Sequence, residues 1–147
     1  MQLIDPTSRT EAAVLLRRLA SGRITNDDFD ARYPRRSPDL GVVAIGELAW
    51  TLYRDLRTYR LVGVNALSSA DRRLVARCVL FLHSGLPYCW PPFRKKSFLS
   101  RLRGLFSARR NTTENALQAT IDFEIWPFAS AADITRAAHV PNVLTAV

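Results

Sequence analysis

Apolar residues recur at helical spacing over most of the first 85 positions, and this repeat constrains the fold more than any other feature. The longest repeat follows Ser37-Pro38, where proline at the first helical position sacrifices no hydrogen bond. It predicts one helix from there to about Leu61, with a continuous buried face. The apolar stripe consists of Gly41, Ile45, Leu48, Ala49, Leu52, Leu56 and Tyr59.

An earlier helix is predicted over about residues 9–21. Ser8 and Glu11 have the spacing of a capping box, in which a hydroxyl and a carboxylate satisfy the free amides of the first turn. Gly22 favours a left-handed stop. The residues expected to face the core are Ala12, Leu15, Leu16 and Leu19.

Two further helices complete this region. Thr25 is expected to cap a short helix that the Tyr33-Pro34 step ends, because proline disfavours helical geometry in the residue before it. Ser68 is expected to cap a longer helix that ends at Gly85. The apolar stripe of this longer helix is Leu74, Val75, Cys78, Val79, Phe81 and Leu82. The predicted fold class is therefore mainly α, a small antiparallel helix bundle with short links.

The pattern changes after the fourth helix. Residues 87–92 contain three prolines, so we expect an extended strap that lies over the bundle. Residues 117–125 alternate strictly between apolar and polar, which is typical of a half-buried strand. Its partner would be a weak strand near 61–64 or a second copy of the protein. Ser130 is expected to start a final short helix that Pro141 ends.

The chain has the size of one ordinary domain, or of a small domain with a long appendage. It has 147 residues, of which 48% are apolar and 23% charged. We divide it into a helical bundle with the Trp-Pro strap, residues 1–92, and a second part, residues 93–147. The second part holds a basic amphipathic helix, the strand and the last short helix, packed on the bundle or extending from it.

The net charge of +8 is concentrated in one segment. Residues 1–92 carry 13 basic and 9 acidic side chains, whereas residues 93–110 carry seven basic and no acidic side chains. Residues 111–147 carry one basic and four acidic side chains. An excess of basic residues favours anionic partners, so we expect any such partner to contact residues 93–110.

The basic segment is also amphipathic, which leaves three interpretations open. Its helix packs on its own bundle, or it binds an anionic membrane or acidic protein, or it binds nucleic acid. Nucleic acid is the weaker alternative, because phosphate binding does not require an apolar stripe. The basic residues that would bind are Arg94, Lys95, Lys96, Arg101, Arg103, Arg109 and Arg110, and the apolar face includes Phe98 and Leu102.

A second candidate interaction surface lies on the long predicted helix. Trp50 stands off its main apolar stripe, and Arg54 and Arg57 follow at helical spacing. An aromatic ring beside arginines is typical of a surface that binds a partner. The alternative is that Trp50 belongs to a second buried face of a central helix.

Few residues point to catalysis or metal binding. Asp27, Asp28 and Asp30 lack the ligand spacing of a calcium loop, so we expect them to cap a helix or face solvent. His83 and His139 belong to no paired metal-binding motif, and His83 is expected at a helix end that favours a cation. We predict no catalytic residue, metal, cofactor or small-molecule ligand, while an enzyme whose site has no local signature remains a third possibility.

The two cysteines and the apolar runs favour a location inside the cell. Cys78 is expected in the core and Cys89 in the strap, with no paired motif for a disulfide framework or a thiolate metal site. Charged residues interrupt every apolar run, and the first residues do not have the pattern of a secretory signal. We expect a cytoplasmic protein, or one held at the inner face of the membrane.

Three short stretches carry a resemblance. They are GRITNDDF within residues 18–29, LPYCWP at 86–91 and IWPF within 122–128. Together they resemble a group of small bacterial proteins, and no activity or functional residue carries over from that group. The resemblance implies a bacterial, cytoplasmic protein in which the strap and Trp126-Pro127-Phe128 are clasps whose rings pack against the bundle.

These observations favour a non-enzymatic interaction or structural protein. The partner would be another protein, or a second copy of the chain bound through the 117–125 strand. The alternative is peripheral binding to an anionic membrane, or less favourably to nucleic acid, through residues 93–110.

Overall fold

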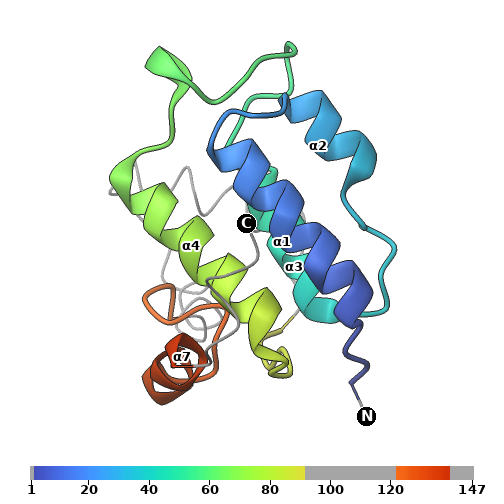
Figure 1. Cartoon of the computed structure of the whole chain (residues 1–147), viewed down its shortest axis with the longest axis vertical. Helices are drawn as coiled ribbons and strands as arrows, with labels where there is room; N and C mark the ends of the chain where they lie inside the picture. Colours follow the sequence, from blue (N-terminus) through green and yellow to red (C-terminus); the bar gives the residue numbers. More distant parts are fainter. Residues whose placement is uncertain (1, 92–121, 140–147) are drawn as a thin grey trace, which may run out of the picture.

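The computed structural model describes residues 2–91 and 122–139. Within them the chain forms five α-helices and one short 3-10 helix, with no β-strand (Figure 1). The elements are α1 (Pro6–Ala20), α2 (Asn26–Arg32), α3 (Leu40–Ala49), η1 (Gly63–Asn65), α4 (Ser69–Ser84) and α7 (Ala131–Ala138). The predicted mainly helical fold is therefore confirmed, whereas the β element near the C-terminus finds no support.

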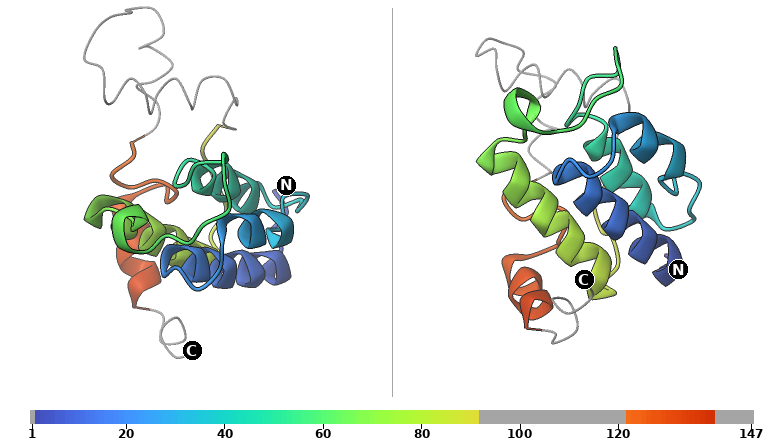
Figure 2. Two further views of the ribbon diagram at one scale, coloured as in Figure 1. Left: turned by 90° about the horizontal axis from the view of Figure 1, so that it is seen from above. Right: turned by 45° about the horizontal axis from the view of Figure 1, so that its top comes forward.

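Helices α1 and α4 form the centre of the bundle. They lie side by side and run in opposite directions, and α3 packs behind them (Figure 1). α2 packs against α1, and α7 packs against α4 (Figures 1 and 2). The buried side chains between these helices include Leu16, Leu19, Ile45, Cys78 and Phe81. The apolar faces predicted for α1 and α4 are thus the faces that meet in the core.

Helix α1 begins earlier than its predicted capping box. Asp5 caps it by accepting from the amides of Thr7 and Ser8, each at 3.1 Å, and Pro6 occupies the first turn. The Ser8 hydroxyl donates to Asp5 at 2.6 Å, so Ser8 supports the cap and is not the cap itself. These hydrogen bonds from Ser8 lower the pKa of Asp5. The Asp-Pro pair is a stronger start signal than a capping box, because proline also presets the helical φ angle.

A buried ion pair joins α1 to the start of α3. The Arg9 guanidinium donates to both oxygens of Asp39, at 2.6 and 3.3 Å, and both side chains are almost fully buried. Asp39 also caps α3 by accepting from the Gly41 amide at 2.9 Å. The Arg9 guanidinium lies 4.9 Å above the ring of Phe81. One charged pair therefore links three helices, and breaking it would leave a buried charge without compensation.

The predicted ends of α2 and α4 and the predicted start of α7 match the structure closely. Thr25 and Asp28 form the capping box of α2, and Tyr33 leaves the helix in an extended conformation before Pro34. Ser68 caps α4, which stops at a left-handed Gly85. Ser130 caps α7, as predicted, and this helix ends at Ala138. Capping depends on neighbouring residues alone, so sequence signals define it well.

Helix α3 is much shorter than predicted. It ends at Ala49, where the Thr51 hydroxyl donates to the Leu48 carbonyl at 2.7 Å and competes for an acceptor that a longer helix would need. The chain then makes turns, and Leu56, expected in the buried stripe, is 92% exposed. Leu61 is buried, but in the irregular segment that follows α3.

The predicted strand is wrong for residues 122–125, which form turns. Asp122 causes this locally, because its carbonyl accepts from the amides of Ile125 and Trp126 and its carboxylate accepts from Glu124 at 2.9 Å. The proposed partner near 61–64 is not a strand either, since Gly63 has a positive φ of 57° and begins η1. Residues 117–121 lie outside the described residues.

The strap and the segment around Trp126 pack together against α4. We call Tyr88, Trp90, Trp126 and Phe128 the aromatic clasp. Trp126 donates through its indole N–H to the Tyr88 hydroxyl at 3.1 Å, and the Trp90 indole donates to the Phe128 carbonyl at 3.0 Å. Tyr88, Trp126 and Phe128 are buried, and Phe128 meets Phe81 of α4 edge to face at 5.4 Å. These rings pack as structural clasps, in the way that the resemblance implies.

Candidate functional site

The irregular segment after α3 holds the two most exposed large apolar side chains of the described residues, Leu56 and Val64. We call Trp50, Arg54, Leu56, Arg57, Arg60, Val62 and Val64 the loop surface. Val64 is fully exposed, Leu56 nearly so, and Trp50 is 39% exposed. The segment lies at the end of the molecule opposite the N-terminus (Figures 1 and 2). Exposed aliphatic side chains between arginines are typical of a surface that contacts a partner.

A buried asparagine holds this segment in place. The Asn26 side chain donates to the carbonyls of Arg54 and Arg57, at 3.3 and 3.0 Å, and accepts from the Tyr59 amide at 2.8 Å. The Asn26 amide donates in turn to the Tyr59 carbonyl at 3.1 Å. Asn26 is buried at the first position of α2. The loop surface is therefore fixed to the bundle, although its side chains face solvent.

Further contacts fix the two halves of the segment. The Tyr59 hydroxyl accepts from the Arg54 amide at 2.6 Å, and the Thr58 hydroxyl donates to Asp27. Val62 packs directly on Gly22, where an added Cβ would lie 2.2 Å from a Val62 methyl group. Gly22 also has a φ of 68°, so both its backbone and its surroundings require glycine. The surface is thus preorganised, which reduces the entropy cost of binding.

Three residues of the loop surface were also predicted from the sequence as an interaction surface, which stays a prediction. Trp50, Arg54 and Arg57 were predicted as an interaction surface on one helix, but α3 ends before them and the helical spacing does not apply. Trp50 is not part of a buried second face, and the Arg57 guanidinium lies 5.7 Å above the Tyr59 ring. Leu56, Val62 and Val64 were missed. The sequence signal near them is the glycine between Val62 and Val64, and in the structure Gly63 adopts a positive φ of 57°.

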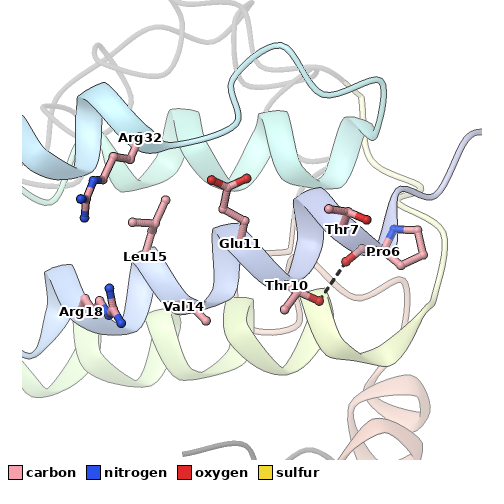
Figure 3. Close-up of a pocket in the computed structure, with 8 residues that line it drawn as sticks. All are labelled: Pro6, Thr7, Thr10, Glu11, Val14, Leu15, Arg18 and Arg32. Carbon is pink, nitrogen blue, oxygen red and sulfur yellow. Dashed lines mark hydrogen bonds between the residues drawn. The ribbon is translucent and has the colours of Figure 1, made fainter.

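A second candidate site is an open groove of about 780 Å³ along α1. Arg18 of α1 and Arg32 of α2 lie at one end of it (Figure 3). Val14 and Leu15 follow, and Glu11 lies beyond them, nearer the N-terminal end of α1 (Figure 3). The remaining lining residues are Pro6, Thr7 and Thr10. The groove therefore has an apolar patch at Val14 and Leu15, with a carboxylate on one side of it and two guanidinium groups on the other.

The acidic cluster of α2 is used in local structure. Asp28 closes the capping box, and the hydrogen bonds from the Thr25 amide and hydroxyl lower its pKa. Asp30 accepts from the Tyr53 hydroxyl at 3.0 Å and pairs with Arg35. Among residues 2–91 and 122–139, no group of histidine, cysteine or acidic side chains is arranged to hold a metal ion.

Cys78, Tyr33 and His83 belong to the packed interior or its edge. Burial raises the pKa of Cys78 and of Tyr33, whose hydroxyl donates to the Val42 carbonyl at 2.8 Å. Burial lowers the pKa of His83, and the nearby Arg17 lowers it further. His83 thus favours the neutral form in the fold, although its position at a helix end predicted a favoured cation. Cys89 is exposed in the strap.

The predicted basic site lies outside the described residues. This holds for Arg94, Lys95, Lys96, Arg101, Arg103, Arg109 and Arg110, and for the apolar residues Phe98 and Leu102. Their role in binding an anionic partner stays a prediction from the sequence. Within the part of the chain that the structure describes, no helix has both the length and the apolar character to cross a bilayer.

Comparisons with known protein families, with curated proteins and with solved structures return no match for this chain. Its function must therefore be inferred from the arrangement of its own residues.

Proposed function

We propose that this chain is a non-enzymatic interaction protein that binds an anionic membrane through its loop surface. The observation that carries the proposal is a rigidly held segment that exposes Leu56 and Val64 among three arginines. A protein gains nothing in its own stability by exposing these side chains in a segment that a buried asparagine fixes. A binding role explains both the exposure and the rigidity.

The chemistry of the surface favours lipid over the other anionic partners. Transfer of an exposed leucine into an apolar phase contributes about 1.5–3 kcal/mol. An arginine near an anionic leaflet adds about 1 kcal/mol. Nucleic acid would use the arginines but not the aliphatic groups. Protein interfaces concentrate their energy in aromatic side chains packed into pockets, whereas Leu56 and Val64 project singly from a loop.

Lipid anchoring of this kind needs two weak signals that act together. Leu56 and Val64 supply the apolar signal, and Arg54, Arg57 and Arg60 supply the electrostatic one. Segment 93–110 would add a second basic, amphipathic contact to the same membrane. A peripheral position at the inner face of the membrane is part of this proposal.

Vesicle co-sedimentation tests the proposal with matched variants. Vesicles of phosphatidylglycerol and phosphatidylcholine should bind the chain, and vesicles of phosphatidylcholine alone should bind it much less. The double substitution Leu56→Ser with Val64→Ser should weaken binding about tenfold or more, since each tenfold change corresponds to about 1.4 kcal/mol. The control is Leu3→Ser with Leu40→Ser, which removes two exposed leucines outside the loop surface and should leave binding unchanged.

Arginine variants separate charge from apolar contact. Arg54→Gln with Arg57→Gln should lower affinity for anionic vesicles and reduce its dependence on salt. The control is Arg36→Gln, an exposed arginine away from the loop surface. Phe98→Ser with Leu102→Ser measures the contribution of segment 93–110 separately. All variants should keep the unfolding temperature of the parent within a few degrees.

Two outcomes would contradict the proposal. One is unchanged vesicle binding by the folded Leu56→Ser, Val64→Ser variant. The other is a steeply salt-dependent shift of DNA or RNA that needs Arg54 and Arg57 but tolerates the serine substitutions, together with no binding to anionic vesicles. That second pattern would support the nucleic-acid alternative.

A further inference from the structure

The groove along α1 carries a charge pattern that complements itself. Glu11 and Arg18 stand at almost equal distances on either side of the Val14-Leu15 pair. Positions 7, 11, 14 and 18 follow steps of four, three and four residues, so they form one stripe along the helix. Seven residues of α-helix span about 10.5 Å, which separates the two charges along the axis. A second α1 in the reverse direction would match acid with base at both ends.

The charged groups in the groove have no ion-pair partner among residues 2–91 and 122–139. Among the described residues, Glu11, Arg18 and Arg32 make no side-chain hydrogen bond or ion pair, and all three are exposed. The positive charge of Arg32 helps to lower the pKa of Asp28, after the hydrogen bonds from Thr25. Arg18 and Arg32 come from different helices and lie at the same end of the groove (Figure 3). This end therefore presents two cations to a single anionic group.

The middle of the groove is apolar and partly open. Val14 is 40% exposed, whereas Leu15 is buried and forms the floor. In an antiparallel pair of helices whose Glu11 and Arg18 face each other, Val14 of each copy lies over Leu15 of the other. A branched apolar side chain over an apolar floor would exclude water between the two flanking ion pairs.

We propose that two copies of this chain associate through their α1 grooves about a two-fold axis near Val14 and Leu15. Glu11 of each copy meets Arg18 and Arg32 of the other, so every contact occurs twice. The charge complementarity of the stripe identifies a second copy as the occupant. This interface differs from self-association through residues 117–125, of which the described part, 122–125, forms turns.

The dimer is independent of the proposed membrane contact. The two-fold axis crosses α1, and the loop surface lies at the end of the molecule opposite the N-terminus, where α1 ends (Figure 1). An antiparallel arrangement therefore places the two loop surfaces at opposite ends of the dimer. Substitutions in the groove should leave the affinity for anionic vesicles unchanged, so either proposal can fail without the other.

Charge reversal and its rescue test the dimer by sedimentation equilibrium at low salt. The parent chain should show a concentration-dependent dimer that weakens as salt increases. Glu11→Arg alone and Arg18→Glu alone should each weaken the dimer about tenfold or more, because one substitution alters two symmetric pairs. An equimolar mixture of these two variants should form a heterodimer, since both pairs between positions 11 and 18 are then opposite in charge.

A matched mixture separates specific pairing from general attraction between charged proteins. Glu11→Arg mixed with Arg36→Glu has the same net charges but places the reversed arginine outside the groove. It should show only the Arg36→Glu homodimer. Val14→Asp should also abolish the parent dimer, whereas Leu3→Asp, at a more exposed leucine outside the groove, should not.

Three results would overturn the proposal. The first is a parent chain that stays monomeric up to about 1 mM at low salt. The second is a folded Glu11→Arg variant that dimerises as well as the parent. The third is a mixture of Glu11→Arg and Arg18→Glu that forms no more heterodimer than the matched control mixture. Circular dichroism of every variant establishes that it is folded.

Discussion

The aromatic clasp and the loop surface are both irregular segments, yet they place their apolar side chains in opposite ways. Each is anchored by a side chain on a helix that donates to backbone carbonyls. Arg77 of α4 donates to the carbonyls of Trp126 and Phe123, at 2.6 and 2.5 Å, and Asn26 of α2 donates to those of Arg54 and Arg57. The clasp buries its large rings, whereas the loop surface exposes Leu56 and Val64. The proposed membrane contact depends on this exposure.

The clasp should account for far more of the folding stability than the loop surface. Trp126→Ala removes a fully buried ring, its edge-to-face contact with Tyr88 and its hydrogen bond to the Tyr88 hydroxyl. We expect the free energy of unfolding to fall by about 3–5 kcal/mol, as for other large buried rings. Urea denaturation followed by circular dichroism measures this loss.

The matched control for the clasp is Phe123→Ala, at a neighbouring ring that is 38% exposed. It should lower the free energy of unfolding much less. If Trp126→Ala lowers the free energy of unfolding by less than about 1 kcal/mol, the clasp does not belong to the cooperative core. The clasp and the loop surface would then not differ in their contribution to stability.

Removal of the Asn26 side chain should let the loop-surface segment change conformation more freely. Asn26→Ala removes three hydrogen bonds between its buried side chain and the backbone of residues 54–59. A hydrogen bond contributes about 1 kcal/mol, and some of the freed groups regain water, so we expect a loss of about 2 kcal/mol. Hydrogen exchange should accelerate at the Tyr59 amide and leave the central turns of α4 protected.

The control for this anchor is Asn65→Ala, at a less buried asparagine in η1 of the same segment. It should change the free energy of unfolding by less than about 0.5 kcal/mol. Equal exchange rates at Tyr59 in the parent and in Asn26→Ala would mean that the segment holds its conformation without Asn26. The preorganisation argued for the loop surface would then be wrong.

Local signals predicted the helices well because helix starts and stops depend on near neighbours. Thr25, Ser68, Gly22 and Gly85 act within one helical turn, and the structure places all four as predicted. The start of α1 was misassigned because Ser8 and Asp5 offer competing caps, and the Asp-Pro pair decides between them.

Long-range contacts explain why the predicted length of α3 was wrong. Leu52 and Leu56 continue the apolar spacing of α3, so periodicity alone extends the helix. The turns that replace it are held by Asn26, which lies 33 residues from Tyr59 in the sequence. The expected strand failed for a different reason, since Asp122 directs its hydrogen bonds into a local turn.

The candidate sites were found only in part for the same reason. Trp50, Arg54 and Arg57 were predicted as an interaction surface from their helical spacing and from the pairing of an aromatic ring with arginines. Their prediction assumed a helix, so it could not place Leu56 or Val64 beside them. The groove was missed because it depends on Arg32 of α2 meeting Arg18 of α1, which no spacing within one helix reveals.

The smallest expected effect on the free energy of unfolding is its pH dependence through His83, which lies near the aromatic clasp. His83 lies in the last turn of α4, just before the strap, and burial followed by the charge of Arg17 holds its pKa below the ordinary value of 6.5. The unfolded chain therefore binds a proton more readily than the folded chain as pH falls through 6.5. The free energy of unfolding should decrease over that range and level off once both states are protonated.

In His83→Gln this component of the pH dependence should disappear. The contribution of the carboxylates stays in both proteins and cancels in their difference. Identical slopes between pH 7.5 and 5.5 for the two proteins would show that His83 titrates alike in the folded and unfolded chain, and that the end of α4 is as open to water as the loop surface.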